Sequence, residues 1–306
     1  MTRLRLGFIG TGTVGSALAR ALARAGYPVT ALFNRTAEKA ARLAASIEGA
    51  CAFDSAQGVV DACDLVFLTV SDDSIEALCG SLSRPCGRGI EPSCGSIDSA
   101  SKWAVVHCSG AASVDILRSA RSQGAAVGVF HPLQTLARPE EAEDNLAGSA
   151  FGIEASAPEL AATLSEIANA LGGTPLAIAG EKAIYHASAV IASNYLVTLM
   201  DIAASLWSHL GLTREEGLRA LLPLVRGTLT NLERIGLPTA LTGPIARGDI
   251  GTLKKHLAAL GDCDENLRLL YRTVGTRTVD LAVRKGTLTP DVAAELKRTL
   301  GESEHA

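Results

Sequence analysis

The sequence predicts an α/β protein with an amino-terminal doubly wound, mostly parallel sheet followed by an all-α carboxyl-terminal domain. Two patterns support this prediction. Short apolar runs alternate with helical segments through residue 180, which is typical of strands joined by crossover helices. From residue 181 onward, apolar residues recur at helical spacing without strand-like alternation. We therefore expect two domains, 1–180 and 181–306.

The composition narrows the partners and the compartment. The 306 residues carry a formal net charge of −4, and without a basic excess the chain is not expected to bind nucleic acid. The seven cysteines are scattered and form no CxxC pair, which favours reduced thiols in a cytoplasmic protein and no metal site. No stretch of 18 residues lacks polar groups, and Met1-Thr2-Arg3 leads directly into the first apolar run. We therefore expect neither a signal peptide nor a membrane span.

A glycine motif near the amino terminus indicates a dinucleotide-binding turn. The apolar run 4–9 ends in this motif, and an Ala- and Leu-rich helical segment follows to residue 24. In this order, the first glycine makes the tight turn, the second leaves room for a ligand and the third lets the helix pack closely on the strand. Backbone N–H groups at the helix start then face a pyrophosphate, which the helix dipole favours. The alternative is an ordinary glycine turn in a sheet protein. The motif residues expected to bind the cofactor are Gly10, Thr11, Gly12, Thr13, Val14 and Gly15.

The end of the second strand predicts which dinucleotide fits. Segment 27–34 is typical of a strand and is followed by Arg35 and Thr36, at the point where NAD-binding sheets usually carry Asp or Glu. A carboxylate would repel a 2′-phosphate, whereas Arg35 beside the amide of Asn34 and the hydroxyl of Thr36 attracts one. We therefore predict NADP(H) as the cofactor. In the alternative, Arg35 is a solvated residue at a helix start and does not select the cofactor.

Further apolar runs supply the other strands of a sheet of about eight. The run 64–70 is continuous, as expected for a parallel strand covered on both faces. Val70 and the following Ser71 are expected near the cofactor, because ligands bind at the carboxyl ends of such strands. Asp72 or Asp73 is expected to cap the next helix. The remaining segments are a surface excursion at 84–102 and strands at 103–108, 125–130, 150–155 and 175–179.

Polar side chains follow two of these strands. Ser109 comes directly after the run 103–108, and His131 directly after the run 125–130. With the two strands as neighbours, both side chains line a substrate pocket on the cofactor side. His131 would bind a carboxylate or a carbonyl group there. The alternative is that Pro132 fixes a turn and His131 only bonds the backbone.

The second domain opens with a segment that predicts one long helix, since residues 181–210 contain no Gly or Pro. At about 100° per residue, Lys182, His186 and Ser193 fall within one stripe, and Asn194 lies about 80° from His186. Burying such groups among apolar neighbours is costly without a purpose, which makes them candidates for chemistry. A solvated helix start would explain Lys182 equally well. Later helices are expected at 214–229, interrupted by Pro223, and at 253–260, 264–285 and 291–300.

A second polar cluster lies in the segment 241–249. Gly243 and Pro244 fix a loop there, so that the side chains of Thr242 and Asp249 can point at a ligand. Asp249 or the later Thr252 can equally cap the helix that follows. Both roles can hold at once.

Four segments carry a resemblance to a known family. They are GTGTVG at residues 10–15, HPLQTL at 131–136, YHASAVIASNYLVTL at 185–199 and ALTGPIARGD at 240–249. The chain resembles the bacterial Rossmann-like proteins with a DUF2520 carboxyl-terminal domain. More widely, it is similar to the group of 6-phosphogluconate dehydrogenase, 3-hydroxyacid dehydrogenase and ketopantoate reductase. This resemblance implies an NADP-binding Rossmann domain followed by a helical domain that supplies catalytic groups and usually a dimer interface, so that a homodimer is expected.

The wider group also implies roles for residues on the long helix. In that group a lysine on the first long helix protonates the forming alcohol, and an asparagine one turn later orients the substrate. In one register, Lys182 takes the place of the lysine and His186 that of the asparagine. In the other, His186 takes the place of the lysine, Val190 replaces the first asparagine, and Asn194 matches a second one found in ketopantoate reductases.

Some members of the DUF2520 family are thought to be an alternative form of ketopantoate reductase. By this resemblance, Thr242 and Asp249 correspond to the hydroxyl and acidic residues with which ketopantoate reductase holds its substrate. Either His131 or Thr242 would then bind the substrate carboxylate.

The resulting hypothesis is an NADPH-dependent reductase of a small 2-oxo acid, with ketopantoate to pantoate as the best single match. His186 or Lys182 would give a proton to the carbonyl oxygen, and Asn194 and Ser109 would hold the substrate oxygens. Two alternatives stay open. One is an imine reductase of the pyrroline-5-carboxylate reductase type, and the other is a regulator that binds NADP(H) without turnover.

Overall fold

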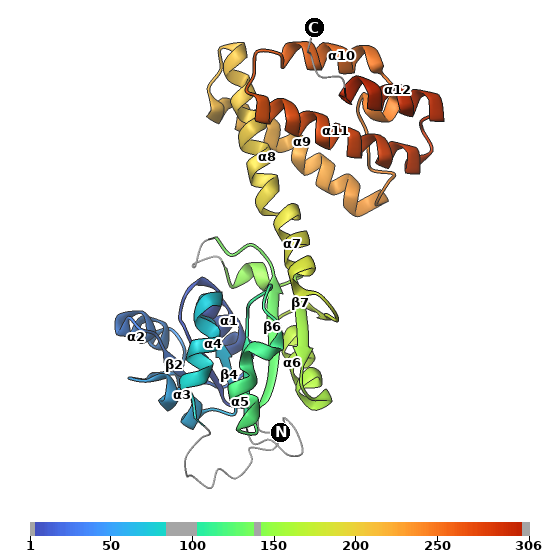
Figure 1. Cartoon of the computed structure of the whole chain (residues 1–306). Coiled ribbons are helices and arrows are strands. Elements are labelled where there is room, and N and C mark those ends of the chain that lie inside the picture. Colours follow the sequence, from blue (N-terminus) through green and yellow to red (C-terminus); the bar gives the residue numbers. More distant parts are fainter. Residues whose placement is uncertain (1–3, 84–102, 138–141, 302–306) are drawn as a thin grey trace. The chain divides into compact units, whose positions relative to one another are not determined.

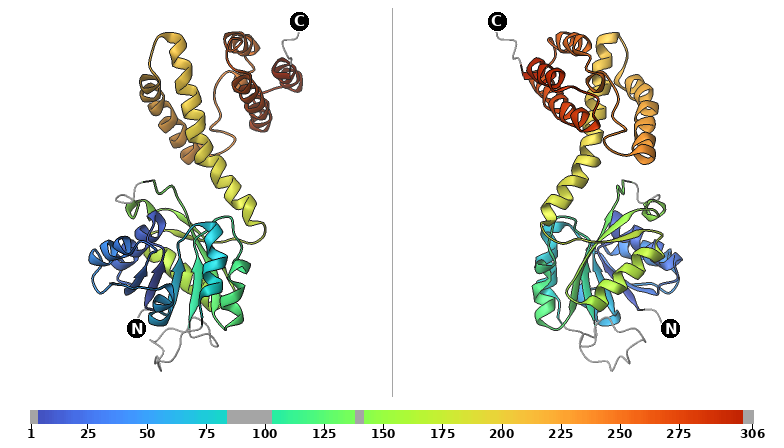
Figure 2. Two further views of the ribbon diagram at one scale, coloured as in Figure 1. Left: turned by 60° about the vertical axis from the view of Figure 1, so that its left-hand side comes forward. Right: turned by 90° about the vertical axis from the view of Figure 1, so that its right-hand side faces the viewer.

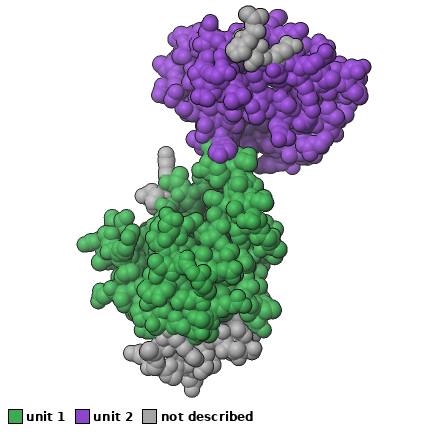
Figure 3. Space-filling view, in the orientation of Figure 1, with its two compact units in different colours: residues 1–194 green, residues 195–306 purple. Residues whose placement is uncertain are grey.

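The computed structural model of the chain describes residues 4–83, 103–137 and 142–301. It divides into two compact units, residues 1–194 and 195–306 (Figure 3). The predicted division at residue 180 falls inside the first unit, between its last strand and the helix that follows. The predicted surface excursion 84–102 lies outside the described residues.

The described residues of the first unit form an eight-stranded sheet with helices on both faces (Figures 1 and 2). The strand order is β3-β2-β1-β4-β5-β6-β7-β8, and neighbouring strands are parallel except β6 and β7. The predicted doubly wound, mostly parallel sheet is therefore confirmed. The strands are β1 (Leu6–Ile9), β2 (Val29–Phe33), β3 (Cys51–Ala52), β4 (Leu65–Leu68), β5 (Ala104–His107), β6 (Ala126–Leu133), β7 (Ala150–Ala155) and β8 (Thr174–Ala177). The helices between them are α1 (Thr13–Arg24), α2 (Ala37–Ala45), α3 (Ala56–Ala62), α4 (Asp72–Ser81), η1 (Val114–Leu117), α5 (Arg118–Ser122), η2 (Asp144–Leu146) and α6 (Pro158–Ala170).

Aromatic side chains form a row through the core on one face of the sheet. The ring of Phe8 stacks on that of Phe67 at 4.8 Å between centroids, and Phe130 stacks on Phe151 at 4.9 Å. Phe67 meets Phe130 edge-on at 5.8 Å. Helices α1 and α6 complete this core, while α3, α4 and α5 form a second core on the other face. Because both faces are covered, the central strands are buried along their whole length, which explains their continuous apolar runs.

The strand register places the candidate site at one edge of the sheet. The last residues of β1, β2, β4 and β5 pair with one another across the sheet. Strand β6 continues past this line, from Val129 opposite the end of β5 to Leu133, and there pairs with β7. His131 lies opposite Gly152 in this extension. The loops that follow the parallel strands therefore meet at the edge beyond which His131 stands.

The structure corrects two strand predictions. Strand β3 (Cys51–Ala52) was not predicted, because two exposed residues are too few to show a period. Strand β6 passes the predicted end at residue 130, so that Pro132 lies inside the strand. In an antiparallel pair, each strand uses the N–H groups of alternate residues only. The pairing of β6 with β7 can therefore accommodate one proline.

The predicted single helix over 181–210 consists of three pieces, α7 (Lys182–Ala192), α8 (Asn194–Ser205) and η3 (Leu206–Leu210). The first break is at Ser193, which has φ −113° and ψ −69°. By length and composition, the run 182–210 is apolar enough to cross a membrane: an 18-residue window has a mean hydropathy of 1.5, and 6% of that window is buried. The absence of a membrane span therefore stays a prediction.

The described residues of the second unit are helical, as expected. A small core holds this unit together, in which Leu253, Val279 and Leu296 are buried. The predicted interruption at Pro223 is wrong, because α9 passes through this residue. A proline removes only one backbone N–H, and the capping box of Thr213 and Glu216 fixes the first turn of this helix. The helices are α9 (Arg214–Ile235), η4 (Ile245–Arg247), α10 (Ile250–Ala259), α11 (Glu265–Lys285) and α12 (Pro290–Gly301).

Candidate active site

The glycine turn after β1 has the backbone geometry that the motif predicts. Gly10 has φ +101°, and a Cβ atom there would lie 2.6 Å from the carbonyl oxygen of Thr69. Thr69 Oγ1 donates a hydrogen bond to the Gly10 carbonyl at 2.5 Å. A Cβ on Gly15 would lie 2.5 Å from the same Oγ1, and closer still to the Gly10 carbonyl. Gly10 and Gly15 are therefore fixed by packing within the protein.

Gly12 differs from the other two glycines of the motif. A Cβ atom on Gly12 would meet no atom within 4 Å, so that the space beside it is open. Gly12 is also the N-cap of α1, where it supplies no side-chain hydrogen bond, and the first turn of this helix has no acidic residue. The first N–H groups of a helix have no partner within the helix. An uncapped, acid-free helix start beside an open glycine fits a pyrophosphate.

Residues around the glycine turn complete this cradle. A side-chain atom of Val70 lies 3.0 Å from the position of a Cβ on Gly10, which places Val70 beside the glycine turn. Ser71 is exposed, and its hydroxyl lies 2.8 Å from that of Ser74. Ser71 is the N-cap of α4, so the expectation that Asp72 or Asp73 caps this helix is wrong. Both aspartates lie in its first turn, where the helix dipole favours their charge.

The end of β2 presents a cationic and polar group of residues without a carboxylate. Asn34 Nδ2 donates to Thr11 Oγ1 at 2.9 Å, and Asn34 Oδ1 accepts from the backbone N–H of Thr36 at 2.9 Å. Asn34 therefore braces this loop against the glycine turn. Arg35 and Thr36 are exposed beside it. This donor set fits a 2′-phosphate, with the guanidinium of Arg35 as the strongest group.

A cavity of about 460 Å³ lies against α7 and the end of β6. Three predicted catalytic residues line it, namely His131, His186 and Asn194, together with Ser193 from the predicted helical stripe. The rings of His131 and His186 meet edge-on, with 6.2 Å between their centroids. The structure therefore brings together one residue of the sheet and three of the long helical segment, all within the first unit.

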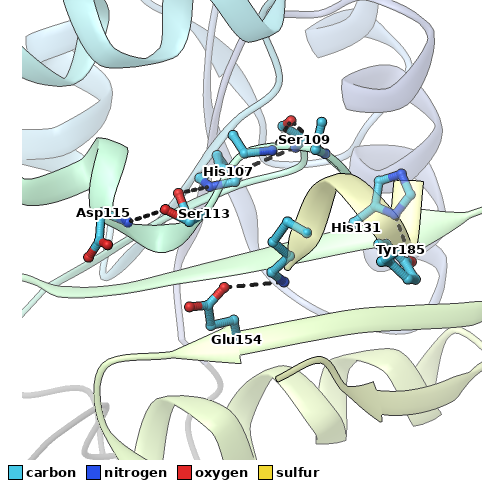
Figure 4. Close-up of polar contacts among 10 residues, drawn as sticks. His107, Ser109, Ser113, Asp115, His131, Glu154 and Tyr185 are labelled. Atoms are coloured by element: carbon cyan, nitrogen blue, oxygen red, sulfur yellow. Dashed lines mark hydrogen bonds and ion pairs between the residues drawn. The ribbon is translucent and has the colours of Figure 1, made fainter. Parts of the chain in front are cut away.

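Tyr185 contacts His131 through its hydroxyl. The Tyr185 hydroxyl lies 2.9 Å from Nδ1 of His131, and the two rings are perpendicular, as Figure 4 shows. Two glycines make room for this cluster. A Cβ on Gly152 would lie 2.8 Å from the Tyr185 hydroxyl, and one on Gly110 would lie 2.7 to 2.8 Å from atoms of both histidine rings. His131 thus bonds a side chain, and the alternative of a purely backbone-bonded histidine is not what the structure has.

The surroundings of His131 keep its imidazole neutral. Burial, together with the nearby His186 and Lys182, lowers the pKa of His131 to about 4, against the opposing effect of Asp72. His107 also faces this ring and adds to the lowering of the pKa. A neutral imidazole has one N–H donor and one acceptor nitrogen. At neutral pH, His131 therefore serves as a hydrogen-bonding group and not as a cation.

Lys182 points away from the cavity that its helix lines. Its side chain is 5% exposed, and Nζ lies 3.2 Å from Oε2 of Glu154 on β7 (Figure 4). A buried ammonium needs such a partner, because an unpaired buried charge is strongly destabilising. Lys182 is absent from the residues that line the cavity. The helical stripe predicted from the sequence is therefore divided between an internal ion pair and the cavity wall.

Ser109 organises the loop after β5. Its hydroxyl donates to Oδ2 of Asp72 at 2.6 Å and accepts from the N–H groups of Ala111 and Ala112 at 3.2 and 3.1 Å. Its own N–H donates to Nδ1 of His107 at 3.2 Å. The donor of the Ser109 hydroxyl is thus already used. These bonds support a positioning function for Ser109, while its proposed contact with substrate stays a prediction.

The hydrogen-bond partners of buried His107 determine its tautomer. Because Nδ1 accepts the N–H of Ser109, the ring hydrogen is on Nε2, which lies 3.2 Å from the carbonyl oxygen of Ser113 (Figure 4). Burial lowers the pKa of His107, so the ring is neutral. His107 thus ties the loop 107–113 to the end of β5 without offering a free donor.

Thr242 and Asp249 belong to the second unit. Thr242 is exposed. Asp249 is the N-cap of α10, with Oδ1 accepting from the N–H of Thr252 at 2.9 Å and Oδ2 accepting from the Thr252 hydroxyl at 2.7 Å. These two bonds hold the pKa of Asp249 below its usual value. The capping function is present, and the substrate contacts of Thr242 and Asp249 stay predictions.

Sequence reasoning missed Tyr185, Glu154 and the two glycines beside the histidine cluster. Tyr185 stands next to His186 in a segment that was singled out, but a tyrosine among apolar residues looks like core. Gly110 and Gly152 gave no motif signal. Only the pairing of β6 with β7 and the direction of α7 place these residues around His131.

Comparison with known families agrees with this geometry. Residues 5–88 match the family model described as "NADP oxidoreductase coenzyme F420-dependent", and residues 149–278 match the model described as "Domain of unknown function (DUF2520)". The resemblance inferred from the sequence is therefore confirmed, as is NADP(H) as the predicted class of cofactor. No curated protein matches the chain.

Solved structures share the fold of this chain over almost its whole length. A Thermotoga maritima protein is 25% identical, with a TM-score of 0.69 and coverage of 92% of this chain and 99% of the other. A Bacteroides fragilis protein that is assigned as an NADP oxidoreductase is also 25% identical, with a TM-score of 0.67 and coverage of 89% and 96%. Plasmodium falciparum pyrroline carboxylate reductase, with NADP bound, is 15% identical, with a TM-score of 0.56 and coverage of 98% and 99%. The match to the NADP oxidoreductase family model identifies the chain as an NADP-linked oxidoreductase.

Proposed function

We propose that this protein is an NADPH-dependent reductase of a small 2-oxo acid, with ketopantoate as the first substrate to test. The observation that carries the proposal is the cavity that His131, His186 and Asn194 line together. In this cavity a neutral donor, a second imidazole and an amide surround space for a small carbonyl compound. Metabolites of this kind are held by a few placed polar groups in an otherwise apolar pocket.

The cofactor is held by the amino-terminal residues in this proposal. The pyrophosphate lies on the first N–H groups of α1, at Thr13, Val14 and Gly15, with Gly12 leaving the space open. Arg35, with Thr36 beside it, holds the 2′-phosphate. When bound, NADPH supplies the hydride that the substrate carbon takes up.

The chain's own residues manage the proton and the substrate oxygens. His186 donates the proton to the carbonyl oxygen, because it lines the cavity and an imidazole can serve as a general acid. Asn194 and His131 hold the substrate oxygens. Ser109 contributes through the loop it organises, and Lys182 is the weaker candidate for the proton donor because its ammonium pairs with Glu154.

Residues of the second unit complete the substrate site in this proposal. Thr242 binds the substrate carboxylate, and Asp249 fixes the segment 241–249 by capping α10. The hydroxyl of Thr242 is exposed and can meet a ligand. Asp249 contacts the substrate only if its carboxylate accepts a hydrogen bond from a substrate hydroxyl as well as those that cap α10.

Imine reduction is the second candidate. It is favoured by the fold shared with a pyrroline carboxylate reductase over 98% of this chain, and by the absence of a lysine or arginine among the described residues that line the cavity. A neutral imidazole suits the nitrogen or oxygen of an uncharged group better than it suits a carboxylate. The assay below distinguishes reduction of a carbonyl from reduction of an imine.

The test is oxidation of NADPH, followed by absorbance, against a panel of 2-oxo acids that includes ketopantoate and against cyclic imines. Turnover of ketopantoate, with a fall of about 100-fold or more in His186→Ala, supports the proposal, since a general acid contributes that much. Decay with imines only supports the second candidate. Tight binding of NADPH without turnover of any compound would identify a regulator and overturn both.

We further propose that the protein is a cytoplasmic homodimer in which a second copy covers exposed apolar side chains. Ile184, Ile191 and Val197 on α7 and α8 are 71%, 63% and 70% exposed, and Leu224 on α9 is 67% exposed. Monomers rarely expose so many large apolar groups, whereas obligate dimers bury them. The relatives that the sequence resembles use their helical domain in this way.

Sedimentation velocity of the full chain tests this assembly. A dimer that dissociates in Val197→Asp supports the proposal, while Thr198→Asp gives a matched control at the adjacent position of the helix. A monomer at micromolar concentration would contradict it. Because the run 182–210 also has the length and composition of a membrane span, flotation with phosphatidylcholine vesicles serves as the second arm, and flotation would contradict the cytoplasmic dimer.

A further inference from the structure

The hydrogen bond between Tyr185 and His131 has a direction that the surroundings determine. The two atoms are 2.9 Å apart, and either could be the donor by distance alone. Gly152 lies beside this hydroxyl, because a Cβ atom on Gly152 would be 2.8 Å from the Tyr185 oxygen. Burial also raises the pKa of Tyr185, which keeps its hydrogen in place.

A phenolic hydroxyl has one hydrogen to donate, and a neutral imidazole has one nitrogen that accepts. Among the residues that the structure describes, Nδ1 of His131 is the acceptor within hydrogen-bond distance of this oxygen. If Nδ1 carried the ring hydrogen, the phenolic hydrogen would have no partner among the described residues. The phenol is therefore the donor and Nδ1 the acceptor.

We infer that Tyr185 is a positioning residue that holds His131 as the Nε2–H tautomer and so directs a fixed hydrogen-bond donor at the substrate site. This inference rests on the proposed function, because it assigns the atom of His131 that contacts an uncharged oxygen or nitrogen acceptor. Gly110 makes the arrangement possible. A Cβ on Gly110 would lie 2.8 Å from Nε2, so a side chain there would cover the donor.

The chemical consequence is a donor that needs no reorganisation when the substrate binds. A neutral imidazole N–H aimed at a carbonyl oxygen stabilises the negative charge that develops there during hydride transfer. The proton remains on His131 throughout, while a second group, His186 in our proposal, supplies the proton that the product keeps. The two imidazoles thus have separate functions in one cavity.

The decisive experiment is a long-range ¹H–¹⁵N correlation spectrum of the imidazole rings in the full-length, ¹⁵N-labelled protein at pH 7, without substrate. We expect His131 to show a protonated Nε2 and an unprotonated Nδ1. His107 serves as an internal reference for this pattern, because Ser109 fixes the same tautomer there. A protonated Nδ1 on His131, or a doubly protonated ring, would overturn the inference whatever the enzyme reduces.

Tyr185→Phe tests whether Tyr185 is the residue that determines the tautomer of His131. We expect the His131 signals to shift toward a mixture of tautomers, and kcat for NADPH oxidation to fall about 10-fold with KM for NADPH unchanged, since the lost bond is worth about one net hydrogen bond. The chain offers a matched pair in the second unit, where Tyr271 lies 2.8 Å from Nδ1 of His256. Tyr271→Phe should move only the His256 signals.

Unchanged His131 signals in Tyr185→Phe would overturn the inference. If Tyr185→Phe does not fold, the spectrum of the unmodified protein still decides the tautomer. The tautomer is measured without turnover, so a protein that shows the expected spectrum but reduces no compound would contradict the proposed function alone.

Discussion

Gly12→Ser separates the ligand-binding function of the glycine turn from its structural function. Gly12 has φ −73° and ψ −168°, a backbone conformation open to any residue, and a Cβ atom there would touch nothing within 4 Å. Serine is a preferred N-cap, and its Oγ would accept a hydrogen bond from an N–H of the first turn of α1. Relative to glycine, this cap stabilises the fold by a few tenths of a kcal/mol. A rise in Tm of about 1 °C is expected.

The same substitution should weaken the binding of NADPH. The serine hydroxyl competes for an N–H that would otherwise face the pyrophosphate, and a hydrogen bond to a charged group is worth about 1.5 to 3 kcal/mol. The expected rise in Kd is therefore about 10- to 150-fold. Kd is measured by NADPH fluorescence, and Tm by thermal unfolding without cofactor.

Gly80→Ser is the matched control for this experiment. Gly80 lies near the end of α4, and a Cβ there would also meet no atom within 4 Å. NADPH should bind this variant as it binds the unmodified protein. An unchanged Kd in Gly12→Ser, or a loss of binding that comes with a lower Tm, would refute the assignment of Gly12 to the pyrophosphate.

Three further predictions follow from the same contacts. Gly15→Ala should lower the free energy of unfolding by about 1 to 3 kcal/mol in denaturant titration, because its Cβ would overlap the Gly10 carbonyl and Thr69; equal stability would contradict the close packing. Arg35→Asp should raise KM for NADPH at least 10-fold and lower KM for NADH, because a carboxylate repels the 2′-phosphate and accepts the ribose hydroxyls; an unchanged preference in paired kinetic assays would place cofactor selection elsewhere. The pKa of His131 is lowered to about 4 in the folded protein. The unfolded chain therefore binds a proton at this residue below about pH 6.5, whereas the folded protein binds it only below about pH 4. As the pH is lowered from about 6.5 to about 4, the free energy of unfolding should therefore fall by up to about 3 kcal/mol more in the unmodified protein than in His131→Gln. If urea titrations show the same dependence of the free energy of unfolding on pH in both proteins, the prediction is contradicted.

The sheet could be predicted because its signals are local. Central strands covered on both faces read as apolar runs, and the glycine motif carries backbone requirements that few other residues satisfy, as the φ of Gly10 shows. The same reasoning failed where local signals are weak or misleading. Two exposed residues form β3, and Pro223 lies within α9 although proline usually ends or bends a helix.

The histidine cluster could be predicted only in part. The end of β6 and the helical phase of α7 indicated His131 and His186 separately. Their meeting depends on the extension of β6 along β7, which no local pattern reveals, and on Gly110 and Gly152, whose missing side chains make the room. Tyr185 is separated from His131 by 54 positions in the chain, so the hydrogen bond between them can be identified only from the structure.

The charges around α7 also bear on which residue donates the proton. A proton donor must reach the substrate oxygen, but the ammonium of Lys182 is paired with the carboxylate of Glu154 at 3.2 Å and is absent from the residues that line the cavity. A neutral amine there would also leave Glu154 half-buried without its partner. His186 lines the cavity itself, and no carboxylate is among the described residues that line it. These positions therefore favour the register in which His186 takes the place of the lysine and Asn194 that of the second asparagine.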